Sequence, residues 1–109
     1  MTQKGNHLGE FEELVLLAAA SLPDEPYGVS IMKYIESETG RNVNISAVHE
    51  VLKRLERKGY VKSRMGGATA ERGGRRKRYF FLTAAGKRTL EEAIRLKLHL
   101  YKQVPNFSI

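Results

Sequence analysis

Cysteine and tryptophan are absent from this 109-residue sequence, and proline occurs only three times. Without cysteine the chain has no disulfide framework, no thiolate zinc site, no iron–sulfur centre and no thiol nucleophile. The length is enough for one small domain and too short for two domains with separate cores. A chain without cysteine suits a reducing compartment, and we expect a cytoplasmic protein.

Long hydrophobic runs are also absent. The most apolar stretch, Leu14 to Leu22, has nine residues, whereas a membrane-spanning helix needs about 20. Glu10, Glu12 and Glu13 stand directly before it, where a secretory signal carries basic residues. We therefore predict a buried helix, no targeting segment and no membrane partner.

Residue groupings typical of catalysis or metal binding are missing as well. His7, His49 and His99 are far apart in the sequence and lack an evident partner ligand. The glycines from Gly66 to Gly74 are not followed by the Lys-Ser/Thr pair of a phosphate-binding loop. No serine, histidine and acid arrangement indicates a catalytic triad. We expect no enzyme activity, no metal and no cofactor.

Acidic residues are scarce in the middle of the chain, where positive charge is concentrated. Between Arg41 and Arg88 there are fourteen basic and three acidic residues, a net charge of +11, whereas the whole chain carries +7. Segregated positive charge attracts polyanions and releases their condensed counterions. The pattern favours nucleic acid as a partner; the alternative is a basic surface that is simply solvated.

Two helices are predicted first. One covers about Glu10–Leu22 and is ended by the prolines of Pro23–Pro26. The other covers Gly28–Thr39, with Gly40 as its C-terminal stop. The apolar positions expected to face the core are Phe11, Leu14, Val15, Ala18 and Leu22 in the first helix and Ile31, Met32 and Ile35 in the second.

A third helix is predicted from Ile45 to Lys58, with Asn44 as its N-cap and Gly59 as its stop. Together with the second helix and the short polar link between them, it makes a helix-turn-helix candidate. Its apolar stripe is Val48, Val51, Leu52 and Leu55.

A β-hairpin is predicted next. Val61–Met65 begins and ends with an apolar residue on the same strand face, Lys77–Leu82 is rich in aromatics, and Gly66–Gly74 between them holds four glycines. Phe80 and Leu82 share the strand face expected to join the core. The order of elements predicts a mainly α fold with a small β-hairpin, a winged helix-turn-helix, in which the hairpin loop and the residues that flank it form the wing.

A last helix is predicted from Ala84, capped by Thr83, to about Gln103. Its apolar residues form two stripes, which is more apolar surface than the core of one domain can cover. This excess predicts a partner that packs against the helix. One stripe is Leu90, Ile94, Leu98 and Tyr101; the other is Ala93, Leu96 and Leu100.

With these elements placed, the sequence resembles the PadR family of winged-helix transcriptional regulators over about Leu8 to Ile94. A Tyr-Gly pair, Tyr27-Gly28, opens the second helix, and Arg54-Leu55-Glu56 followed by Gly59 matches the end of the family's third helix. The hairpin then matches the signature Tyr-Tyr-x-Leu-Thr-x-x-Gly, with Tyr79-Phe80-Phe81-Leu82-Thr83-Ala84-Ala85-Gly86.

The chain looks like the short subfamily, which has a single C-terminal dimerisation helix. This resemblance implies a winged helix-turn-helix DNA-binding domain at 8–83, the dimerisation helix of the same compact module at 84–104, and flexible tails at 1–7 and 105–109. It also implies a homodimer in which the last helix packs against the partner subunit's first and last helices. The expected dimer interface is Phe11, Leu14, Leu90, Ile94, Leu98 and Tyr101.

The third helix is expected to lie in the major groove of DNA. Lys53 is a candidate for a guanine edge or a phosphate, and Glu50 would accept from a cytosine amino group or repel the backbone. His49 and Glu50 replace the family's usual tyrosine and proline, so the resemblance carries a docking mode and no base preference. The candidate set is Asn44, Ser46, His49, Glu50, Lys53 and Arg57, and its alternative reading is an ordinary solvated helix face.

The wing supplies a second group of candidates, for phosphates or a narrow minor groove. Such contacts position a protein more than they read sequence. Arg78 is expected to share a strand face with Phe80 and Leu82 and is not counted among them. The wing candidates are Arg72, Arg75, Arg76 and Lys77.

We therefore predict a DNA-binding transcriptional regulator, a repressor that binds a palindromic operator as a homodimer. The alternative is a winged-helix module for contact with protein or RNA, without sequence-specific DNA binding. A small-molecule effector stays undetermined: Phe11, Tyr101 and Phe107 are candidates to line an aromatic site, and dimer packing explains them as well.

Overall fold

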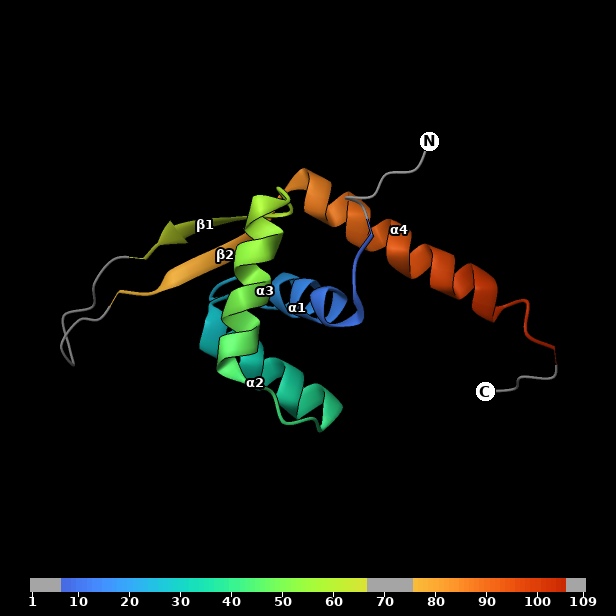
Figure 1. The fold of residues 1–109 in the computed structure, drawn as a ribbon, viewed down its shortest axis with the longest axis horizontal. Helices are drawn as coiled ribbons and strands as arrows, with labels where there is room; N and C mark the ends of the chain where they lie inside the picture. Colours follow the sequence, from blue (N-terminus) through green and yellow to red (C-terminus); the bar gives the residue numbers. More distant parts are fainter. Residues whose placement is uncertain (1–6, 67–75, 106–109) are drawn as a thin grey trace.

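The computed structural model of the protein describes residues 7–66 and 76–105. In this part of the chain α1 (Glu10–Ser21), α2 (Gly28–Thr39) and α3 (Ile45–Arg57) precede a hairpin of β1 (Val61–Met65) and β2 (Arg78–Leu82), and α4 (Ala84–Tyr101) follows. The first three helices form a central body, from which the hairpin projects on one side and α4 on the other (Figure 1). This confirms the predicted fold class, mainly α with a small β-hairpin in winged helix-turn-helix order.

The predicted ends of four elements were too long by one or two residues. Leu22 and Lys58 are the C-caps of α1 and α3 and not their last helical residues. The second strand begins at Arg78 and not at Lys77. The last helix ends at Tyr101, and a turn then carries the chain through Gln103. Helix ends fray and caps lie half inside the helix, so sequence patterns place these boundaries least well.

The core lies where α1, α2 and α3 meet, and β2 and the first half of α4 close it. Leu16 and Leu17 were both expected to widen the apolar face of α1; Leu16 is fully buried, whereas Leu17 is 39% exposed. Gly40 ends α2 with a positive φ of 73°, as its predicted role as a stop requires. The fully buried aliphatic side chains are Val15, Leu16, Ile31, Val48, Leu52 and Leu55.

Both strands attach the hairpin to the body, β1 through the buried Val61 and β2 through Phe80. β1 and β2 pair antiparallel with Val61 opposite Leu82, and Phe80 points into the core with 5% exposure. The backbone N–H of Phe80 also donates to the carbonyl of Pro26 at 2.8 Å. β2 is therefore held both by its core side chains and by the segment that leads into α2.

The junction between the hairpin and α4 explains a short sequence motif. Thr83 caps α4 by accepting from the N–H of Gly86, and its hydroxyl donates to the carbonyl of Gly59 at 2.7 Å. A Cβ at Gly86 would lie 2.0 Å from the carbonyl oxygen of Tyr60. The spacing Thr-x-x-Gly thus caps a helix and permits a backbone approach that a side chain would prevent.

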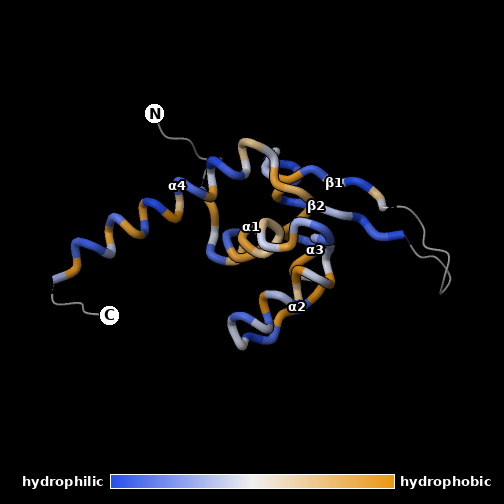
Figure 2. The backbone as a smooth tube through the Cα atoms, turned by 180° about the vertical axis from the view of Figure 1, so that it is seen from behind, coloured by the Kyte–Doolittle hydropathy of each residue, from blue (hydrophilic) through white to orange (hydrophobic). Residues whose placement is uncertain are grey.

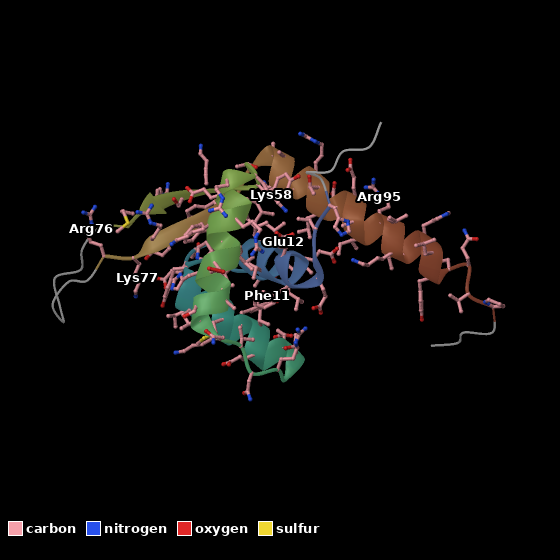
Figure 3. The ribbon with its side chains drawn as sticks, in the orientation of Figure 1. Phe11, Glu12, Lys58, Arg76, Lys77 and Arg95 are labelled. Carbon is pink, nitrogen blue, oxygen red and sulfur yellow. The ribbon has the colours of Figure 1, made fainter. Side chains whose placement is uncertain are left out.

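Three glutamates at the start of α1 each pair with a cation from another element. Glu10 binds Arg41 in the α2–α3 turn at 2.9 Å, Glu12 binds Lys58 after α3 at 3.2 Å, and Glu13 binds Lys97 of α4 at 2.6 Å. Figure 3 shows Glu12 and Lys58 at the contact between α1 and α3. The acids that argued against a signal peptide therefore serve to join α1 to the rest of the fold.

Glu12 is the most buried of these acids, at 6% exposure. Burial by itself raises the pKa of its carboxyl, but the N–H of Gly9 and the cations of Lys58 and Arg54 outweigh that effect. The pKa of Glu12 consequently lies below the ordinary value for a glutamate.

α4 changes character along its length. Leu90 is buried and Ile94 packs against the core, whereas Leu98 is 52% exposed. Figure 2 shows hydrophobic segments recurring along the part of α4 that extends beyond the body. Within residues 7–66 and 76–105, no helix is long and apolar enough to span a membrane.

Candidate nucleic-acid interface

The two sides of α3 differ sharply. One side is buried through Val48, Val51, Leu52 and Leu55, the predicted apolar stripe. The other is open to solvent, as the helical spacing of the candidate residues predicted. The candidates Ser46, His49, Glu50, Lys53 and Arg57 are all exposed, as are Ala47, Arg54 and Glu56.

The start of α3 is capped as expected. Asn44 uses its side-chain oxygen to accept from the backbone N–H of Ser46 at 2.7 Å. That contact leaves the side-chain amide nitrogen of Asn44 as a donor for an outside group. Ser46 is exposed beside it, so both candidate phosphate contacts stand at the same end of the helix.

The four cations at the end of α3 divide into two pairs. Arg54 and Lys58 face α1 and share the carboxylate of Glu12, at 3.5 Å and 3.2 Å. Lys53 and Arg57 are exposed, and none of the ion pairs among the described residues includes them. Lys53 and Arg57 are therefore the two of these cations that no described carboxylate binds.

His49 lies against the first turn of α2. A Cβ built on Gly28 would come within 2.5 Å of the His49 ring. The glycine of the Tyr27-Gly28 pair therefore makes room for this side chain, and the contact limits where the ring can lie. His49 stays exposed on its other side, at the outer face of α3.

A groove of about 840 Å³ runs between α3, the start of α2 and the second strand. We call it the basic groove, because among the described residues that line it four are lysine or arginine and one is acidic. Its lining residues are Tyr27, Gly28, Val29, His49, Lys53, Glu56, Arg76, Lys77, Arg78 and Phe80.

Two wing candidates can be placed. Arg76 and Lys77 stand at the outer end of the hairpin (Figure 3). The Lys77 ammonium lies 4.6 Å from the centre of the Tyr27 ring, and Arg76 donates to the carbonyl of Gly66 at 3.3 Å. Both side chains are exposed and held near the basic groove. The other two candidates, Arg72 and Arg75, lie outside the described residues.

The face of the hairpin away from the core carries an aromatic row. The rings of Tyr27 and Tyr79 meet edge to face at 5.9 Å, and Tyr79 lies 6.4 Å from Phe81. The Arg64 guanidinium stacks over Phe81 at 4.8 Å. Rings and cations therefore stiffen the hairpin where the core does not reach it.

Arg78 behaves differently from the wing candidates. Its guanidinium donates to the hydroxyl of Ser63 at 3.1 Å, and that hydroxyl donates to Glu56 at 2.8 Å. The prediction that Arg78 points toward the core face of the hairpin agrees with this contact, since Ser63 pairs with the buried Phe80.

Comparison with known protein families identifies the family of this chain. Residues 16–92 match the model of the transcriptional regulator PadR-like family. The chain belongs to the PadR-like family of transcriptional regulators. No curated protein matches its sequence.

Several solved structures resemble this PadR-like chain. A transcriptional regulator from Clostridium thermocellum has 20% identity and a TM-score of 0.70, with 94% of this chain and 100% of that chain covered. A PadR family regulator from Clostridium difficile R20291 has 26% identity and a TM-score of 0.64, with coverage of 83% and 91%. Another from Eggerthella lenta has 23% identity and a TM-score of 0.62, with coverage of 84% and 79%.

The dimer residues expected for the PadR-like chain occupy unequal positions. Leu90 is buried within its own subunit, and Phe11, Leu14 and Ile94 are partly buried against the same core. Leu98 and Tyr101 are exposed. The exposed surface is thus concentrated toward the free end of α4; Phe107 lies outside the described residues.

The sequence did not single out Glu56, which lines the basic groove, or Ser63, which contacts both Glu56 and Arg78. The strand register could have placed Ser63 and Arg78 on one face of the hairpin. The distance from that face to Glu56 depends on how the hairpin docks on α3, which no local pattern encodes. Among the described residues, no group of three or more His, Asp or Glu side chains is placed to hold a metal ion.

Proposed function

We propose that this PadR-like regulator binds double-stranded DNA by placing the outer face of α3 in the major groove. The observation that carries the proposal is the division of α3 into a buried apolar side and an exposed polar side next to the basic groove. A major groove about 12 Å wide admits an α-helix and presents a distinct donor and acceptor pattern for each base pair. The side chains assigned to it are Asn44, Ser46, His49, Glu50, Lys53 and Arg57.

In this proposal the hairpin contacts the phosphates of the DNA backbone. Arg76 and Lys77 stand at the end of the basic groove, and arginine and lysine there neutralise phosphates. Arg72 and Arg75 join them on sequence grounds alone. Contacts of this kind fix the register of the protein on the duplex, while α3 reads the bases.

The proposal includes a homodimer that represses transcription from a palindromic operator. Its support is the apolar surface that one subunit leaves open: a groove of about 330 Å³ beside α4, lined by Leu17, Leu90, Ile94 and Leu98 among others. A second copy would cover this surface with its own helices. Two-fold symmetry then sets two recognition helices about 34–36 Å apart, on successive major-groove faces.

Fluorescence anisotropy tests the proposal. A labelled duplex from the region upstream of the protein's own gene is compared with a scrambled duplex of the same composition, at several salt concentrations. We expect a preference for the native duplex that persists as salt rises, because base contacts depend on salt less than phosphate contacts do. A promoter reporter carrying the preferred duplex should then lose expression when the protein is present.

Equal binding to both duplexes, lost together as salt rises, would contradict the proposal. The basic groove would then be a patch for polyanions in general. A structured RNA of equal charge, tested in the same assay, distinguishes this result from the alternative of an RNA-binding winged-helix module.

A further inference from the structure

Glu56 is the one acidic residue among the described side chains that line the basic groove. A free carboxylate at this place would repel the DNA phosphates that Lys53, Arg76 and Lys77 attract. Glu56 is not free, because it accepts a hydrogen bond of 2.8 Å from the hydroxyl of Ser63. This hydrogen bond indicates a structural role for Glu56 in the groove.

Ser63 connects two charged groups from different elements. Its hydroxyl donates to Glu56 in the last turn of α3 and accepts from the guanidinium of Arg78, in β2, at 3.1 Å. A hydroxyl has one proton to donate and lone pairs to accept with, so one small side chain serves both neighbours. We call the chain Glu56–Ser63–Arg78 the relay.

The relay stands where apolar packing of the hairpin ends. Along the inner face of β1, Val61 is buried, Ser63 is half-buried and Met65 is exposed. A two-stranded hairpin is marginal in isolation and depends on what it packs against. From Ser63 outward, the relay continues the attachment of the hairpin to α3.

We propose that Ser63 is a positioning residue for DNA binding: its hydroxyl links Glu56 to Arg78 and so fixes the hairpin at one angle against α3. At that angle α3 and the wing cations meet one duplex together. The inference rests on the proposed DNA-binding function and adds to it a role for side chains that touch no DNA. Arg78, although basic and next to the wing, is assigned to the relay and not to a phosphate.

The test measures duplex affinity against salt for Ser63→Ala, Ser63→Thr and the unaltered protein. Each phosphate contact contributes about 0.9 to the slope of log K against log salt. Ser63 is neutral, so a change in this slope must come from cations that it holds in place. For Ser63→Ala we expect roughly tenfold weaker binding. The salt dependence should become shallower by about one to two units of slope, because Arg76 and Lys77 no longer contact the DNA phosphates.

Two further variants act as controls. Ser63→Thr keeps the hydroxyl and suits a strand, so it should restore both the affinity and the slope. Ser21→Ala removes a hydroxyl that donates to the carbonyl of Leu17 within α1, at 2.8 Å. It is the matched serine substitution away from the groove, and it should change neither quantity.

Glu56→Ala gives a second test, in which the two possible roles of Glu56 predict opposite changes in DNA affinity. If Glu56 acts only through its charge, its removal brings tighter DNA binding. If it supports the relay, binding weakens, and the loss is smaller in a chain that already carries Ser63→Ala, because both changes break the same contact. Thermal unfolding of each variant shows whether the fold is retained.

The outcomes distinguish the positioning role of Ser63 from the DNA-binding function itself. Unaltered affinity and slope in Ser63→Ala, together with tighter binding by Glu56→Ala, would overturn the positioning role and leave the DNA-binding proposal standing. Absence of salt-dependent duplex binding by the unaltered protein would overturn the proposed function, and the role of Ser63 with it.

Discussion

The hairpin end of the molecule exposes cations, whereas the free end of α4 exposes leucines. The two ends project from opposite sides of the helical body (Figure 1). Arg76 and Lys77 mark the first, and Leu98 and Leu100 mark the second. Neither group is needed to close the core of one subunit, so each end indicates a partner of its own chemistry. A polyanion suits the first end and an apolar surface suits the second.

A second contrast separates cations that form ion pairs within the protein from cations that do not. Lys53 and Lys58 are five residues apart around the end of α3, yet Lys58 is bound to Glu12 while Lys53 faces solvent. Basic residues thus divide into those that join helices and those that we propose contact DNA.

The largest expected effect is at the apolar end. Leu98→Glu places a charge where a second copy is proposed to pack, and Leu98 is exposed in one subunit, so the fold should persist. We expect a monomer and, because the second half-site is lost, roughly 100-fold weaker operator binding. Analytical ultracentrifugation and anisotropy measure the two effects.

Leu96→Glu is the matched control for that change. Leu96 is 58% exposed on α4 but lines a different groove, with Leu8 and Glu13. Because the proposed dimer groove is lined by Leu98 and not by Leu96, this change should leave the dimer intact. A stable dimer with full operator affinity in Leu98→Glu would contradict the proposed interface.

At the charged end, Lys53→Ala should weaken duplex binding about tenfold without changing the free energy of unfolding. A phosphate contact would lower the salt slope by about one, equally for every sequence; a base contact would relax the preference at one position instead. Anisotropy with native and altered duplexes distinguishes these cases. Unchanged affinity for all duplexes would remove Lys53 from the interface.

Lys58→Ala should give the reverse result. Loss of its contact with Glu12 lowers the free energy of unfolding by about 1 kcal/mol, because a buried acceptor loses a charged donor. The salt slope of duplex binding should not change. Urea denaturation measures the first quantity, and a slope reduced as in Lys53→Ala would show that the division between the two lysines is wrong.

The smallest effect concerns pH. Because the folded pKa of Glu12 is lowered, its contribution to stability is present at neutral pH and is lost as pH falls below about 4, near the ordinary glutamate pKa. Glu12→Gln should be less stable than the unaltered protein at pH 7, and the difference should shrink toward pH 3. Thermal unfolding across this range checks it; a constant difference would contradict the pKa direction.

Much of the fold could be predicted because its signals are local. The helical spacing of Val48, Val51, Leu52 and Leu55 fixed the inner face of α3, and Asn44 and Thr83 are caps that the sequence displays directly. The burial of Glu12 and Glu13 had no such signal. It depends on cations that arrive from α3 and α4 only after the helices pack.

The candidate site shows the same limit. The outward residues of α3 followed from periodicity alone, whereas the contact of His49 with Gly28 and the relay through Ser63 depend on how separate elements dock. Charge counts found the basic half of the chain. They did not distinguish Arg54, Lys58 and Arg78, which contact Glu12 or Ser63, from Lys53 and Arg57, which form no ion pair with a described residue.

Lysine acetylation, read by mass spectrometry with and without bound duplex, tests the central claim most directly. DNA on the outer face of α3 and the hairpin should protect Lys53 and Lys77, while Lys102, exposed beyond α4, reacts equally in both states and serves as the internal reference. If Lys53 and Lys77 react at the same rate with the duplex bound as without it, DNA binds elsewhere and the account is wrong.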